Sequence, residues 1–198
     1  MKIRGGTGQY AIKFESAARA FACSTFVWVG LFLVLVSTVK AQSVRASQKG
    51  TVSQMVANTE VLIEYSRPSA RGRVLFGPEG IVKYSKIWMP GANEASNIKI
   101  SDDVFVNGKP LAAGRYSIWT IPGENDWTII FSKDWDQWHT RYPGEEQDAL
   151  RIQVRSSKSQ HMEMLSFYFP LVTKTSAAIN LHWGKTIIPF VIDLAEPK

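Results

Sequence analysis

The chain has 198 residues, of which 45% are hydrophobic and 12% aromatic, with 23 Lys and Arg against 17 Asp and Glu. This aromatic content and moderate charge exclude an intrinsically disordered or low-complexity protein, and a single cysteine excludes a disulfide scaffold. The composition is that of an ordinary globular protein with one domain. It assigns no activity, so whether the protein is an enzyme stays open.

Residues 1–41 have the pattern of a targeting segment. Basic residues precede a charge-free apolar run at residues 20–39. Cleavage after Ala41 would make the segment a signal peptide, whereas an uncleaved run of this length would serve as a signal anchor. The pattern predicts an exported protein, periplasmic or extracellular, that contacts the membrane only through residues 20–39 and only if the leader is retained.

The leader carries most of the excess positive charge. It holds five of the 23 basic residues and one of the 17 acidic residues, which leaves 18 basic and 16 acidic residues. Because the remaining chain has no basic surplus to neutralise phosphates, we expect no nucleic-acid partner. Cys23 also lies in the leader, so the mature domain would be free of cysteine. No nucleotide-binding or other cofactor motif follows, and we expect no cofactor.

After the leader, residues 42–58 are polar and show neither strand alternation nor a helical stripe, which predicts a linker or loosely held N-terminal arm. The folded domain is expected over residues 59–195. Short β-rich runs recur there between turn signals, which predicts a single all-β domain, an antiparallel β-sandwich of roughly nine to eleven short strands. The runs lie at residues 60–66, 73–77, 81–88, 97–101, 103–108, 114–121, 126–132, 150–156, 164–170 and 177–192.

Three local features refine this expectation. Asn107-Gly108 predicts a tight hairpin, because two-residue turns of this kind need positive φ at both central positions. Gly184 is expected to divide the final run into two strands. The irregular stretch at residues 133–149 predicts a short helix or a functional loop.

Three arginines, Arg67, Arg71 and Arg73, follow the first strand of the domain within seven residues, and Pro68 and Gly72 force this segment to turn. Guanidinium groups held by a tight turn can grip a carboxylate, sulfate or phosphate, since each offers five donors in one plane. The structural alternative is that they pair with Asp or Glu at the sheet edge and fix the loop.

A second polar element combines Trp88, Asn93 and Glu94 in one loop, where the indole offers a stacking surface and the other two offer donors and acceptors. The structural alternative is that Asn93 and Glu94 cap backbone groups of the turn. Together the two elements predict a polar pocket for a small anionic or sugar-like ligand, in a binding or envelope-associated module. Its lining residues would be Arg67, Arg71, Arg73, Trp88, Asn93 and Glu94.

An enzymatic hypothesis uses the same residues. Glu94 would act as the general acid or base of a hydrolase-like enzyme while the arginines hold the charge of the substrate. A third hypothesis makes the cluster a salt-bridged corner of the sandwich with no ligand. The sequence identifies no protein partner.

The three histidines, His139, His161 and His182, fit no compact metal motif, so no metal site is predicted. His182 alternates with Leu181 and Trp183 and is expected to face solvent.

Six tryptophans remain after the leader, and Trp135 and Trp138 stand in the irregular stretch beside polar residues. This placement predicts either a platform for a sugar or peptide or a lid over the sandwich.

Four motifs occur in order between Thr59 and Asp193: YSRPSARGRVLFG, KIWMPGANEAS, VNGKPLAAGRYSIWTIP followed by DWTIIFS, and LHWGKTIIPF. Through them the chain resembles the bacterial domain of unknown function 2911 family. The resemblance implies an exported, β-rich protein and implies no activity. The family pattern has an arginine directly after the tryptophan where this chain has Met89, so a fourth cation beside the three arginines is missing here.

Overall fold

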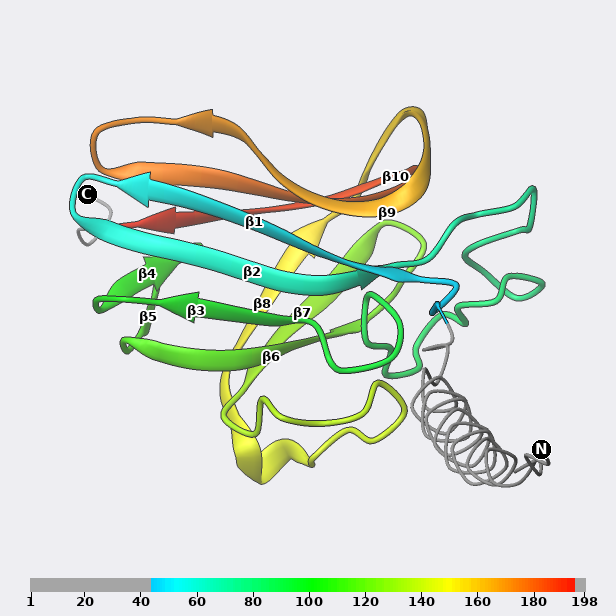
Figure 1. The fold of residues 1–198 in the computed structure, drawn as a ribbon, viewed down its shortest axis with the longest axis horizontal. Coiled ribbons are helices and arrows are strands. Elements are labelled where there is room, and N and C mark those ends of the chain that lie inside the picture. Colours follow the sequence, from blue (N-terminus) through cyan, green and yellow to red (C-terminus); the bar gives the residue numbers. More distant parts are fainter. Residues whose placement is uncertain (1–43, 195–198) are drawn as a thin grey trace, which may run out of the picture. The chain divides into compact units, whose positions relative to one another are not determined.

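The computed structural model describes residues 44–194, so the predicted targeting segment and the 20–39 run lie outside the described residues. The described chain forms ten strands in two antiparallel sheets, which confirms the predicted all-β antiparallel architecture (Figure 1). It contains no long apolar helix of the kind that crosses a membrane. The strands are β1 (Gln48–Val56), β2 (Thr59–Arg67), β3 (Asn97–Ile100), β4 (Val104–Val106), β5 (Lys109–Leu111), β6 (Gly114–Ile121), β7 (Asp126–Ser132), β8 (Asp148–Arg155), β9 (Ser157–Val172) and β10 (Ser176–Asp193).

One sheet has six strands in the order β1-β2-β3-β6-β7-β8, and the other has four in the order β5-β4-β10-β9. The predicted hairpin at Asn107-Gly108 is confirmed, because both residues have positive φ and join β4 to β5. Two long connections carry the polar residues of interest: the β2–β3 loop at residues 68–96 and the β7–β8 loop at residues 133–147.

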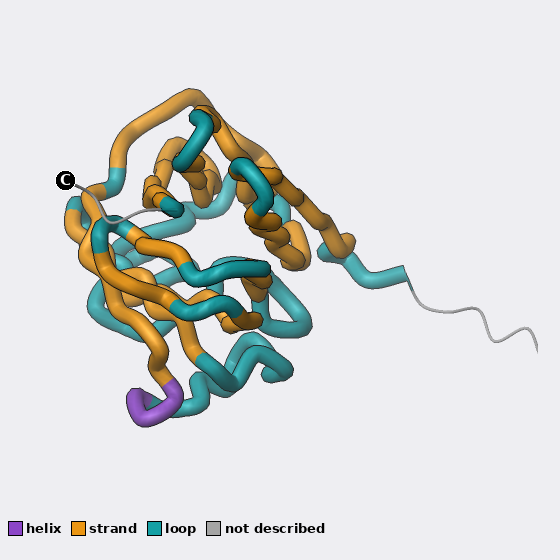
Figure 2. Tube along the Cα trace, turned by 90° about the vertical axis from the view of Figure 1, so that its left-hand side faces the viewer, coloured by secondary structure: helices purple, strands orange, loops and turns teal. Residues whose placement is uncertain are grey.

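The core lies between the two sheets and follows from strand alternation. Inward positions of β2, for example Val61 and Ile63, are fully buried, and so are Phe131 on β7 and Phe190 on β10. A smaller cluster, Met89, Ala95, Trp119 and Ile130, is separate from this main core. Figure 2 shows strands and loops throughout, with one short helical turn.

The prediction of a linker at residues 42–58 is wrong for most of that range. Residues 48–56 form β1, which pairs with β2 along its whole length. Exposure alternates along β1, yet its less exposed positions include Gly50 and Gln54 as well as Val52. A glycine and an amide at these positions removed the apolar alternation that identifies a strand from sequence.

The runs at residues 73–77 and 81–88 were also predicted as strands and are not. They belong to the β2–β3 loop and make only isolated bridges, such as that between Phe76 and Val82. Gly184 does not divide the final run either: its φ of +58° accommodates a shift of register within one continuous β10. The stretch at residues 133–149 is mostly irregular, as expected, with a 3-10 turn at Glu145–Gln147.

Candidate functional site

Arg67 is the last residue of β2, Arg71 and Arg73 follow it in the β2–β3 loop, and the first two contact β9. Arg67 is partly buried, and its Nε donates to the carbonyl of Leu165 at 3.2 Å while Nη2 donates to Ser166 Oγ at 2.7 Å. β2 and β9 belong to different sheets. Arg67 therefore ties the two layers of the sandwich together at this end.

Arg73 donates within its own loop, from Nε to the Ala70 carbonyl at 2.9 Å and from Nη2 to the Ser69 carbonyl at 2.6 Å. Arg71 has a positive φ, and its backbone N–H donates to Glu163 Oε1 at 2.8 Å. The hydrogen bond from His161, followed by that from the Arg71 backbone, holds the pKa of Glu163 below its usual range. These contacts fix the corner between the β2–β3 loop and β9. Most of the hydrogen-bond acceptors are backbone carbonyl oxygens, whereas the structural alternative expected Asp or Glu carboxylates.

Trp88 lies apart from the arginines in an aromatic cluster. Its ring stacks on Trp183 with centroids 6.1 Å apart and meets Phe76 and Trp127 edge to face. Met89, the departure from the family pattern, is 1% exposed in the smaller apolar cluster, and its Sδ accepts from the Ser96 N–H at 3.2 Å. In this chain the position after Trp88 serves packing.

Asn93 adopts a left-handed conformation, with a φ of +62°, and joins three segments. Its Nδ2 donates to the Ser47 carbonyl and to Ser66 Oγ, both at 3.2 Å. Its own carbonyl accepts from the backbone N–H of His139 at 3.0 Å and from His139 Nδ1 at 2.8 Å. Because a carbonyl only accepts, Nδ1 carries the proton, and Nε2 of the neutral ring is left as an acceptor.

Glu94 is an exposed carboxylate that pairs with Arg45, just before β1. Arg45 Nη1 lies 2.5 Å from Oε1 and 2.6 Å from Oε2 of Glu94. This hydrogen bond is the largest cause that holds the pKa of Glu94 below its usual range. Glu94 is therefore ionised well below neutral pH, and the start of the described chain is pinned to the β2–β3 loop.

We expect the carboxyl pKa of Glu94 to rise towards its ordinary value in an Arg45→Ala protein, because the hydrogen bond and the charge that lower it are removed. The measurement is a carboxyl NMR titration, with Glu79 as an internal reference on the same loop. An unchanged Glu94 pKa in the Arg45→Ala protein would contradict the ion pair.

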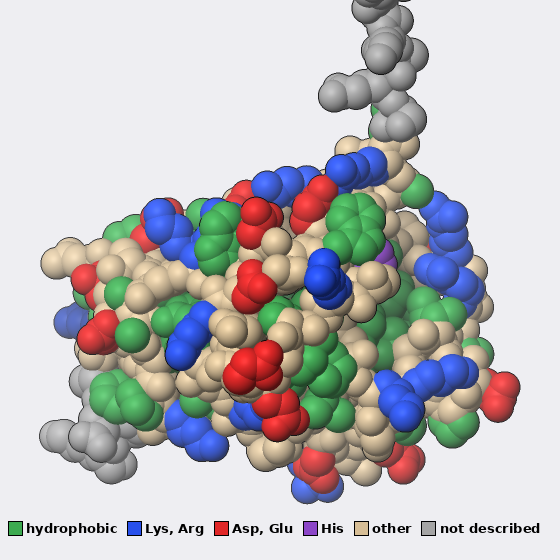
Figure 3. Space-filling model, turned by 90° about the horizontal axis from the view of Figure 1, so that it is seen from below, with side chains coloured by type: hydrophobic (Ala, Val, Ile, Leu, Met, Phe, Trp, Pro, Cys, Tyr) green, Lys and Arg blue, Asp and Glu red, His purple; other side chains and the backbone are tan. Residues whose placement is uncertain are grey.

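The β7–β8 loop carries two exposed tryptophans, and one of them, Trp138, lies beside Glu94. Trp138 is 48% exposed and forms an isolated β-bridge with Glu94, while Trp135 is 38% exposed and carries the Arg115 guanidinium 4.2 Å above its ring. We call Asn93, Glu94, Trp135, Trp138 and His139 the Trp138 surface. In Figure 3, hydrophobic side chains lie among acidic and basic ones on one face of the domain.

The base of the β7–β8 loop is held by a polar network. Tyr142 Oη donates to Asp148, both of whose oxygens lie at 2.8 Å, and Arg151 donates to Asp148 Oδ2 at 2.6 Å and to Tyr142 Oη at 2.9 Å. Burial and then the hydrogen bond to Asp148 raise the pKa of Tyr142 to about 12. The Tyr142 ring packs edge to face on the buried Trp119, so the network anchors the loop to the sheet.

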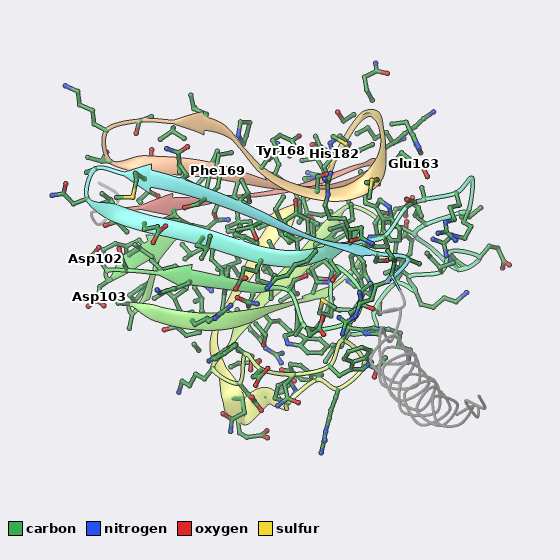
Figure 4. The ribbon with its side chains drawn as sticks, viewed as in Figure 1. Asp102, Asp103, Glu163, Tyr168, Phe169 and His182 are labelled. Atoms are coloured by element: carbon green, nitrogen blue, oxygen red, sulfur yellow. The ribbon has the colours of Figure 1, made fainter. Side chains whose placement is uncertain are left out.

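The prediction that His182 faces solvent is wrong: the residue is 4% exposed. Its Nε2 lies 3.1 Å from the Gln160 carbonyl and its Nδ1 lies 3.4 Å from Tyr168 Oη. Strand alternation holds locally, but β9 has extra residues opposite Gly184 that cover this face of β10. Figure 4 places Tyr168 and His182 together near Glu163, and Asp102 and Asp103 at the far end of β3.

The contacts of the six predicted site residues fall at different places in the described structure. The arginines engage the corner against β9, Trp88 packs in the aromatic cluster, and only Asn93 and Glu94 share a surface. His139 joins that surface although it stands 46 positions from Asn93, and nothing in the sequence pairs them. Within residues 44–194, no three His, Cys, Asp or Glu side chains converge as a metal site would require.

The fold defines a two-sheet, all-β domain with its polar residues on two long loops. A family model described as "Protein of unknown function (DUF2911)" matches residues 47–192, and the chain belongs to this family. The match begins just before β1, in agreement with the inclusion of that strand in the sheet. Comparison with curated proteins and comparison with solved structures each gave no match.

Proposed function

We propose that this protein is an exported, envelope-associated binding module whose Trp138 surface holds a sugar-like ligand. The observation that carries the proposal is the exposure of Trp135 and Trp138 beside fixed polar groups. A tryptophan that is 48% exposed leaves a large apolar face in water, which favours a partner that is apolar on one side and polar on its edge. A sugar ring has this character.

The polar groups around Trp138 are held in place before any ligand arrives. Asn93 fixes the His139 ring through Nδ1, and Arg45 fixes Glu94. Nε2 of His139 and the Glu94 carboxylate are acceptors for ligand hydroxyls, and the Arg45 guanidinium supplies donors. Groups held by their own hydrogen bonds lose little entropy on binding, which raises affinity.

An anionic ligand at the arginines is less well supported, because Arg67 and Arg73 already donate to protein oxygens. The hydrolase hypothesis is also less well supported. A general acid at neutral pH needs a raised carboxyl pKa, whereas Arg45 lowers that of Glu94. A glycosidase would need a second carboxylate near Glu94, and Asp102 and Asp103, two candidates that follow β3 in the sequence, lie beyond the other end of that strand.

We expect Trp138→Ala to weaken binding of a sugar-like ligand about 30-fold, since a buried tryptophan contact at the centre of an interface is worth about 2 kcal/mol. The measurement is a thermal-shift screen of residues 42–198 against neutral and acidic oligosaccharides, followed by calorimetric titration of any hit. Leu171→Ala is the matched control, because Leu171 is an exposed apolar residue of β9 at 63% exposure.

A hit whose affinity is unchanged in the Trp138→Ala protein would refute this site, and the absence of any hit would refute the ligand class. Glu94→Gln separates binding from catalysis. We expect it to weaken binding, because it removes the charge that holds Arg45. A substrate that is turned over by the wild type and not by Glu94→Gln would instead favour the hydrolase.

A further inference from the structure

The β2–β3 loop projects from the sandwich beyond the end of β2 (Figure 1). Part of it folds back on itself: Ile81 N–H donates to the Val74 carbonyl at 3.1 Å, and Val82 N–H donates to the Leu75 carbonyl at 2.9 Å. Leu75 and Val82 are buried in the main core. Their neighbours Val74 and Ile81 point the other way and are 61% and 48% exposed.

This arrangement is closely packed. A Cβ on Gly80 would lie 2.5 Å from the backbone carbon of Phe76, so the turn is as tight as the chain allows. Leu75 lies against Gly184 of β10, where an added Cβ would be 2.6 Å away. With Leu75 and Val82 held in the core, the side chains of Val74 and Ile81 stay exposed to water.

The two aliphatic side chains belong to a cation-rich stretch of the loop. Residues 71–87 hold four exposed basic residues and one exposed acidic residue, Glu79. Glu163, on β9, is the other carboxylate near this cluster, because it accepts from the Arg71 backbone. We call Val74, Ile81 and the four cations the cationic tip. The four cations are Arg71, Arg73, Lys83 and Lys86.

We propose that the cationic tip docks on an anionic lipid bilayer, with Val74 and Ile81 in the headgroup region and Arg71 and Lys86 on lipid phosphates. Arg73 and Lys83 donate to carbonyls of their own loop and add positive charge to the tip. Apolar side chains ringed by Lys and Arg are the chemistry of interfacial membrane binding. A soluble acidic protein would satisfy the cations but leaves no role for a pair of exposed aliphatic side chains on the loop.

The course of the chain supports a bilayer as the partner. Gln48, at the start of β1, pairs with Arg67, the last residue before the β2–β3 loop. The described chain therefore enters the domain at the end from which the tip projects. Five residues separate the apolar run at 20–39 from Arg45. Fully extended, this connection reaches at most about 20 Å, so a retained leader would hold this end of the domain at the membrane.

The test measures lipid contact at the tip directly. Cys23 is the chain's single cysteine and lies in the leader, so residues 42–198 can carry one introduced thiol. Arg45–Lys198 is a compact unit with its own core, which makes this fragment a suitable sample. An environment-sensitive fluorophore is attached to Ile81→Cys, or to Leu171→Cys as the control. Each protein is titrated with vesicles of phosphatidylcholine alone or with 30 mol% phosphatidylglycerol, a probe composition of roughly physiological negative charge.

We expect a blue shift and an intensity increase for the label at position 81 with phosphatidylglycerol vesicles, and none at position 171 or with neutral vesicles. Arg71→Gln combined with Lys86→Gln should weaken partitioning at least tenfold, because each cation near an anionic surface contributes about fivefold. The matched charge control is Lys99→Gln combined with Lys174→Gln, two exposed lysines outside the tip.

Val74→Ser combined with Ile81→Ser should weaken partitioning of the unlabelled protein in a sedimentation assay without changing its thermal midpoint. Equal responses at positions 81 and 171, or equal losses from the two charge variants, would overturn the proposal. So would the absence of binding to phosphatidylglycerol vesicles, which would leave a soluble partner for the tip. The Trp138 surface is intact in all these variants, so failure here does not affect the proposal of sugar binding.

Discussion

Phe131→Ala is expected to lower the free energy of unfolding by about 3–5 kcal/mol. Phe131 is fully buried on β7, and its ring meets Phe190 of β10 edge to face with centroids 5.9 Å apart. The pair joins the two sheets at the core. Truncation removes the buried ring and leaves a cavity that the rigid strands on both sides cannot close.

The measurement is chemical denaturation of residues 42–198 followed by tryptophan fluorescence. Because small domains are stable by only about 5–15 kcal/mol, the variant should be close to unfolding at 37 °C. Leu171→Ala is the control and should change stability by less than about 0.5 kcal/mol, since the side chain is 63% exposed. A loss below about 1 kcal/mol for Phe131→Ala would mean that the sheets do not pack as described.

Asp148→Ala is expected to cost about 2–3 kcal/mol, the second largest effect. The Asp148 side chain is 8% exposed and accepts from Tyr142 and Arg151. Its removal leaves the Tyr142 phenol and the Arg151 Nε without their acceptor at the base of the β7–β8 loop, while Arg151 Nη2 keeps Glu145 at 3.0 Å. In this variant we also expect hydrogen exchange in residues 133–147 to become faster than in the wild type, because the loop loses its anchor. Exchange in β6 should stay unchanged, because the sheet is kept.

The pH dependence of stability checks the same network. The pKa of Tyr142 is raised to about 12, so the neutral phenol is favoured in the folded state. Its contribution to stability is complete below the unfolded pKa of about 10 and is lost as the pH rises from about 10 to about 12. The Tyr142→Phe protein should therefore lose less stability than the wild type between about pH 10 and about pH 12. A variant that loses stability over this range as steeply as the wild type would contradict the role of Tyr142.

Much of the fold could be predicted because strand formation depends on local pattern. The alternation in β7 and β8 and the turn at Asn107-Gly108 are properties of neighbouring residues, and the structure confirms them. β1 could not be predicted because Gly50 and Gln54 interrupt its alternation, and it is a strand because β2 offers a partner edge. The apolar runs in the β2–β3 loop looked like strands, yet Leu75 and Val82 are buried by capping the sandwich rather than by pairing in a sheet.

The candidate site was predictable in residue type but not in grouping. The sequence alone determined the all-β class, the family motifs, the leader pattern and the turns that hold Arg73 and Asn93, because each depends on residues close together in the chain. Only the tertiary structure separated the arginines from Glu94, brought His139 to Asn93 and Arg45 to Glu94, and buried His182 under β9. These contacts join residues 14 to 49 positions apart. Such pairings are set by how sheets and loops pack, which no local pattern of side chains encodes.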